Sequence, residues 1–105
     1  MKILFDQGVP VPLRQSLVGY SVSTAHEQGW SRLANGDLLA AAEQYFDVLI
    51  TTDQNLRYQQ NLTGRRLAIL VLPTTSWRVI QGHVSLVAGA LQNLRSGEYR
   101  ELVFP

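Results

Sequence analysis

The stretch that decides the fold is VLITTD, at positions 48–53. Its branched aliphatic and threonine side chains favour a strand, it is too short for a helix, and acidic residues bound it on both sides. A second apolar run, ILF at positions 3–5, also ends directly at an aspartate, Asp6. The chain therefore contains two predicted buried strands that each stop at a carboxylate, Asp6 in one case and Asp53 in the other.

The rest of the chain alternates between strand and helix patterns. Strands are expected at 20–24, 67–72 and 99–104, and helices at 12–18, 37–45 and 76–94, with a short helix or turn at 55–61. Asn35 or Gly36 is expected to cap the helix at 37–45. Such alternation predicts an α/β fold with a mostly parallel central sheet flanked by helices, because parallel neighbours need a crossover. Sites in these sheets lie beyond the carboxyl ends of the strands.

The composition is that of an ordinary globular domain. The chain has 105 residues, of which 46% are apolar and none is cysteine. One domain over residues 1–105 is therefore expected, and multidomain enzymes are excluded. The apolar runs are far shorter than the ~20 residues that span a bilayer, so no membrane partner is expected. The lack of cysteine excludes thiolate metal sites and disulfides and is compatible with a cytoplasmic location.

Acidic residues follow several of the predicted strands. A parallel sheet brings Asp6 and Asp53 to the same edge, while Asp37 and Glu27 complete the cluster if their connectors fold over that edge. Clustered carboxylates repel one another unless a cation compensates, and all-oxygen ligands suit Mg²⁺ or Mn²⁺. Each acid taken alone also fits an ordinary role, as a helix cap or a solvated side chain. Together they predict a divalent cation site.

These residues also carry a resemblance to a known family. Asp6, the stretch AHEQG at 25–29, Asp37 and VLITTD together resemble the small single-domain branch of the PIN-like superfamily, over about residues 1–80. The resemblance implies a three-layer α/β fold and similarity to the metal-dependent endoribonuclease toxins of bacterial toxin–antitoxin pairs. Asp6 and Asp53 would then bind Mg²⁺ or Mn²⁺, with Asp37 as third ligand or water-orienting base and Glu27 in support. The implied partners are an RNA substrate and a small antitoxin protein, and a second copy of the chain is a further candidate partner.

The chain departs from the family pattern at two positions. Relatives commonly carry an acid directly after the first aspartate and another two residues after the later one, where this chain has Gln7 and Asn55. The amide carbonyls of Gln7 and Asn55 can touch a metal or its water but add no charge, and Thr52 is expected as a further supporting polar residue. Metal affinity should therefore fall, and one metal is expected rather than two.

Arginine supplies the expected contacts to RNA. Nine basic and eight acidic residues give a net charge of +1, so bulk charge predicts no polyanionic partner. Eight of the nine cations are arginine, whose planar guanidinium suits phosphate. Arg57, Arg65 and Arg66 follow the Asp53 strand and, together with Arg14, are expected to bind the RNA backbone.

Two alternatives remain open at this stage. The first is a catalytically silent PIN-like module that binds a protein partner, which Gln7 and Asn55 favour. The second is a receiver-like phosphoacceptor domain, because Asp53 ends a central strand. A receiver needs a lysine late in the chain and an acidic pair after the first strand, whereas the sole lysine is Lys2. Composition therefore counts against the receiver.

Overall fold

Five parallel strands form one sheet at the centre of the computed structural model, which describes residues 1–105. Their order in the sheet is β2-β1-β3-β4-β5, so the two strands that end near aspartates, β1 and β3, are neighbours. The predicted α/β fold is confirmed, and the sheet is parallel throughout. The bounds are β1 Lys2–Phe5, β2 Ser21–Thr24, β3 Val48–Thr51, β4 Ala68–Val71 and β5 Tyr99–Glu101.

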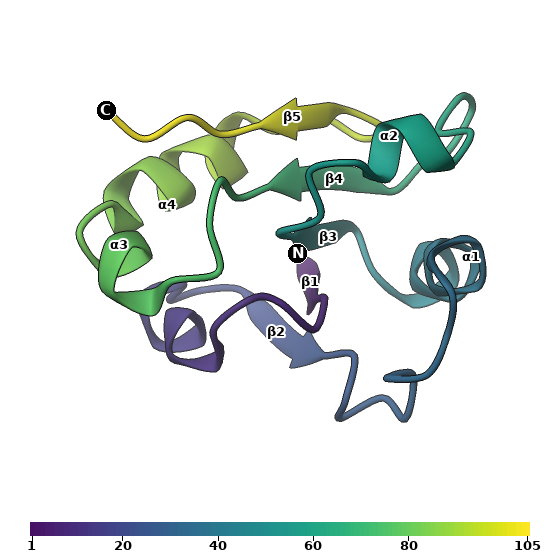
Figure 1. Ribbon diagram of the computed structural model, residues 1–105, viewed down its shortest axis with the longest axis horizontal. Helices are drawn as coiled ribbons and strands as arrows, with labels where there is room; N and C mark the ends of the chain where they lie inside the picture. The colour runs from purple at the N-terminus through teal and green to yellow at the C-terminus, as the bar shows by residue number, and fades with distance from the viewer.

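Helices cover both faces of this sheet. In Figure 1, α3 and α4 lie on one side of the strands and α1 lies on the other, which gives three layers. The turn after β1 leads into a 3₁₀ helix, η1, which packs on the same side as α3 and α4. The bounds are η1 Val11–Ser16, α1 Asn35–Tyr45, α2 Leu56–Gln59, α3 Trp77–Gln81 and α4 Val84–Asn93.

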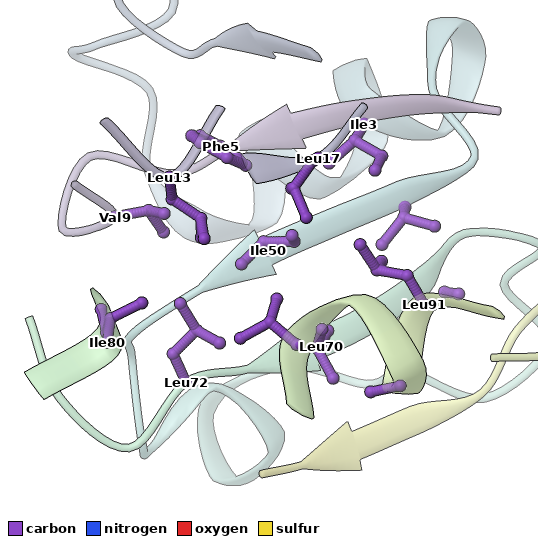
Figure 2. Close-up of a cluster of buried hydrophobic side chains, with 14 residues drawn as sticks. Ile3, Phe5, Val9, Leu13, Leu17, Ile50, Leu70, Leu72, Ile80 and Leu91 are labelled. Carbon is purple, nitrogen blue, oxygen red and sulfur yellow. The ribbon is translucent and has the colours of Figure 1, made fainter. Parts of the chain in front are cut away.

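Side chains alternate between the two faces along each central strand. Phe5, Ile50 and Leu70 point into the core shared with η1, α3 and α4, where they meet Leu13 and Leu91 (Figure 2). The intervening residues point to the α1 side, where a second cluster forms around Leu4, Leu38, Leu39, Leu49 and Ile69. Burial on both faces explains why these strands are continuous apolar runs rather than alternating ones.

The structure corrects the prediction of one long helix at 76–94. The helix ends at Gln81, and Gly82 and His83 separate α3 from α4. Glycine weakens a helix by about 1 kcal/mol relative to alanine, so a break at this position costs little. On either side of the break, Ile80 and Val87 both remain fully buried in the same core cluster.

The start of α1 also differs from the prediction. Ala34 is the N-cap residue and makes no side-chain cap, whereas Asn35 and Gly36 already belong to the helix. The side-chain amide of Asn35 donates instead to the carboxylate of Asp53. None of the helices is both long and apolar enough to traverse a lipid bilayer.

Candidate functional site

A threonine hydroxyl links the two strand-ending aspartates. Thr51 is the last residue of β3 and is fully buried. Its Oγ1 donates to Oδ2 of Asp6 at 2.9 Å and accepts the backbone N–H of Asp53 at 3.1 Å. The backbone N–H of Asp6 donates in turn to the carbonyl of Ile50 at 2.9 Å, which continues the pairing of β1 with β3. Asp6 and Asp53 therefore lie at the same carboxyl edge of the sheet, as the parallel topology predicted.

The oxygens of both carboxylates are only partly used by the protein. Oδ1 of Asp6 accepts the Gln7 N–H at 2.8 Å, and Oδ1 of Asp53 accepts the Asn55 N–H at 2.9 Å. Oδ2 of Asp53 accepts Nδ2 of Asn35 at 3.0 Å. Each oxygen thus accepts one hydrogen bond, whereas an ionised carboxylate offers about four acceptor sites in all. Each aspartate therefore keeps acceptor positions for a further ligand.

Asn35 is a site residue that sequence reasoning missed. Its side-chain amide crosses from the first turn of α1 to Asp53 and also donates to Oε1 of Gln59 at 3.3 Å. Its position beside Gly36 at the start of a predicted helix indicated a helix cap, and nothing in the local sequence indicates the contact with Asp53. No sequence pattern pairs Asn35 with Asp53, because the contact depends on where α1 meets the loop after β3.

The other two predicted acids do not join this pair. Asp37 is exposed in the first turn of α1 and makes no hydrogen bond or ion pair. Glu27 follows β2, and both of its oxygens bind Arg14. No three His, Asp or Glu side chains gather into one group that could hold a metal ion. The expected four-acid cluster is therefore reduced to Asp6 and Asp53.

Glu27 instead forms an anchored ion pair with Arg14. Nη2 and Nη1 of Arg14 donate to the two carboxylate oxygens at 2.8 and 3.2 Å. Glu27 also accepts the Thr24 N–H at 2.9 Å and donates its own N–H to the Thr24 hydroxyl. The hydrogen bond from Arg14, followed by the one from the Thr24 backbone, holds the pKa of Glu27 below its usual value. The carboxylate is therefore fixed as the partner of Arg14.

The predicted supporting polar residues lie around the pair. Nε2 of Gln7 donates to the carbonyl of Ser31 at 3.0 Å, and its own carbonyl has no partner in the protein. Asn55 contacts Asp53 through its backbone, while its side chain makes no hydrogen bond. The hydroxyl of Thr52 lies against Gly8 in the loop after β1. The loops after β1 and β3 thus meet closely at this edge.

Two of the four predicted RNA-binding arginines, Arg65 and Arg66, do not share this edge. Arg65 pairs with Glu43 at 3.5 Å. Arg66 pairs with Asp47, also at 3.5 Å, and donates to the carbonyls of Glu43 and Phe46. Both arginines precede β4 and so lie at the amino-terminal edge, which corrects the expectation that they would sit beside Asp53. The reason is topological, since the connection between parallel strands must return across the sheet before the next strand begins.

The two remaining arginines lie at the carboxyl edge. Arg57 in α2 forms an ion pair with Glu101 at 3.4 Å, at the end of β5. Arg14 lies on the other side of the site, where η1 meets the loop after β2. Of the four predicted RNA contacts, only Arg14 shares a cavity with one of the site aspartates, Asp6.

A cavity of about 440 Å³ opens beside Asp6. The loops after β1 and β2, together with η1, form its walls. Its apolar lining is Phe5, Val9, Val11 and Ala25, and its polar lining is Asp6, Gln7, Arg14, Thr24, His26 and Glu27.

Comparison of the chain with protein-family models, curated proteins and solved structures gives no match. The carboxylates of Asp6 and Asp53, whose residues are linked through the Thr51 hydroxyl, and the unpartnered side-chain carbonyls of Gln7 and Asn55 offer only oxygen donors. This set fits a hard divalent cation such as Mg²⁺ or Mn²⁺ and does not suit zinc or copper.

Proposed function

We propose that the chain is a PIN-like, metal-dependent endoribonuclease in which Asp6 and Asp53 hold one Mg²⁺ or Mn²⁺ ion. The observation that supports this proposal is the Thr51 hydroxyl, which donates to the Asp6 carboxylate and accepts the backbone N–H of Asp53, so that both aspartates stand at the carboxyl edge of adjacent parallel strands. Mg²⁺ commonly binds through one or two carboxylates and keeps several waters. Two aspartates are therefore a sufficient protein contribution for one ion.

The surrounding residues keep the carboxylates in place. Asn35 and the Asn55 N–H orient Asp53, and the Gln7 N–H orients Asp6. When bound, the cation would supply an activated water and offset negative charge on the phosphate. Asp37, the acid predicted as third ligand or water-orienting base, lies in the first turn of α1 apart from this pair, and the proposal does not need it to hold the ion.

Mn²⁺-dependent thermal unfolding tests the metal site. An ion present at about a hundred times its dissociation constant stabilises the folded state by ~2.7 kcal/mol, which raises the Tm of a chain of this size by roughly 10–20 °C. We expect this rise in the wild type and its loss in Asp6→Asn and Asp53→Asn. Asp47→Asn is the matched control, because it removes the same charge at the amino-terminal edge.

RNA cleavage tests the activity itself. Purified wild type is incubated with single-stranded and structured RNA in Mn²⁺, in parallel with the three variants. Cleavage should require Asp6 and Asp53 and should survive Asp47→Asn. Equal cleavage by the wild type and both site variants would show a contaminating nuclease and would refute the proposal.

A silent PIN-like module is the second candidate function. Gln7 and Asn55 replace expected acids, and both oxygens of Asp53 already accept hydrogen bonds from Asn35 and Asn55. An absent Mn²⁺ shift in a well-folded wild type would favour this candidate. Its partner would then be a protein, such as the small antitoxin that the family resemblance implies.

A further inference from the structure

The cavity beside Asp6 has features that metal binding alone does not use. Its volume of about 440 Å³ lies within the range of about 300–1,000 Å³ typical of small-molecule sites and exceeds what a single phosphate fills. Asp6, Arg14 and His26 all line it. The cavity therefore adjoins the proposed metal site.

Arg14 is the cation of this cavity. A guanidinium carries five N–H donors, and Glu27 accepts two of those of Arg14. The Nε–H of Arg14 is buried without a partner. Each terminal nitrogen uses one of its two N–H groups for Glu27 and keeps the other one free. The Arg14 side chain remains 34% exposed. Because Thr24 holds Glu27, Glu27 positions the guanidinium while leaving donors for an anionic ligand.

Two other residues of the lining suit a nucleobase. Val11 in η1 is 55% exposed, although it is apolar, and the His26 imidazole is exposed after β2. Imidazole rings stack on unpaired bases in single-stranded RNA. A nucleotide needs such an apolar and aromatic surface for its base together with donors for its phosphate, and both occur in this one cavity.

We propose that the cavity lined by Asp6, Arg14 and His26 binds the nucleotide of a single-stranded RNA next to the cleaved phosphate. Arg14 contacts the phosphate, Val11 and His26 contact the base, and Glu27 is a positioning residue for Arg14 rather than a metal ligand. This assignment rests on the proposed function for its biological meaning. Binding to the cavity can nevertheless be measured without a metal.

The charges of the cavity predict that two substitutions change RNA affinity in opposite directions. Asp6 and Glu27 contribute two negative charges and Arg14 one positive charge, so the metal-free cavity carries a net charge of −1. In EDTA, Arg14→Gln should weaken the binding of a fluorescent hexauridylate by about tenfold or more, because it removes a charge-assisted contact. Asp6→Asn should tighten binding, because it removes a repulsive charge. A purely structural role of these residues would not produce opposite effects.

Matched variants separate the cavity from general electrostatics. Arg95→Gln removes the same charge before β5, at the amino-terminal edge, and should leave affinity unchanged. His26→Ala should weaken RNA binding. His83→Ala should not, because the His83 ring stacks on Phe104 outside the cavity. Glu27→Gln should tighten binding less than Asp6→Asn does, because it removes a repulsive charge but also the anchor of Arg14.

Several outcomes would overturn the inference. Equal weakening by Arg14→Gln and Arg95→Gln would show nonspecific attraction to RNA. Competition by inorganic phosphate as strong as that by uridine 5′-monophosphate would show a simple anion site. If Arg14→Gln loses its fold by circular dichroism, the tighter binding expected of Asp6→Asn and the weaker binding expected of His26→Ala carry the test. Metal-free binding that depends on Arg14, combined with an absent Mn²⁺ shift, would refute the nuclease proposal and leave the nucleotide site standing.

Discussion

Replacing Gly8 by alanine tests how closely the loops after β1 and β3 approach each other. Gly8 lies two residues after Asp6, and a Cβ atom added to it would lie 2.1 Å from Oγ1 of Thr52. Favourable contacts between nonbonded heavy atoms need roughly 3.5 Å. The next nearest atoms, Cβ of Thr52 and Cγ2 of Thr75, would be at 3.4 and 3.5 Å, which are ordinary contacts. The clash is therefore confined to one hydroxyl.

The net effect is the difference between two opposing terms. Inserting a methyl group into occupied space typically costs about 1–3 kcal/mol. The backbone of Gly8 does not have a positive φ, so alanine also gains about 0.4–1 kcal/mol by restricting the unfolded chain. We expect Gly8→Ala to lower the free energy of unfolding by about 1 kcal/mol, or the Tm by ~4–8 °C. With the hydroxyl removed by Thr52→Ala, only the favourable term remains, and the same substitution should stabilise.

A double-mutant cycle in urea measures this change of sign. The four proteins are the wild type, Gly8→Ala, Thr52→Ala and the double variant. Gly89→Ala is the control, because its new Cβ atom meets nothing within 4 Å in α4, and it should stabilise by about 1 kcal/mol. If Gly8→Ala changes the free energy of unfolding equally in both backgrounds, Gly8 and Thr52 do not lie as close together as the structure places them. The position of Asp6 relative to Asp53 would then need another explanation.

Three further predictions concern single side chains. Thr51→Val should lower the free energy of unfolding in urea by about 1–3 kcal/mol and abolish the Mn²⁺-induced rise in Tm. Thr51→Ser keeps the hydroxyl and should keep that rise. An undiminished rise in Thr51→Val would count against a role of the hydroxyl at the metal site. The lowered pKa of Glu27 means that its ionised form stabilises the fold above pH 4.5 and that this contribution is lost as the pH falls through the lowered value. The stability difference between wild type and Glu27→Gln should therefore shrink in acid, and a pH-independent difference in urea titrations would contradict the ion pair. Arg66→Gln should lower the free energy of unfolding in urea by about 1 kcal/mol, because Arg66 contacts Phe46 and Asp47 at the amino-terminal edge. RNA binding and the Mn²⁺-induced rise in Tm should stay unchanged. Weaker RNA binding by this variant would support the predicted role of Arg66 in binding RNA.

The sequence by itself determined the central strands and the meeting of Asp6 with Asp53. Short apolar runs bounded by polar residues report burial directly, and parallel strands joined by crossovers must end at the same edge. The chain therefore carried both the α/β class and the identity of the two central carboxylates in local patterns.

Only the tertiary structure decided which residues complete the site. Arg65 and Arg66 follow Asp53 closely in sequence, yet the return across the sheet carries them to the opposite edge. Glu27 pairs with Arg14, and Asn35 takes a place beside Asp53, through contacts between segments that no local period relates. Hydrophobic periodicity specifies which side of an element is buried. The partner that a polar side chain meets depends instead on how connectors of differing length pack over the sheet edge.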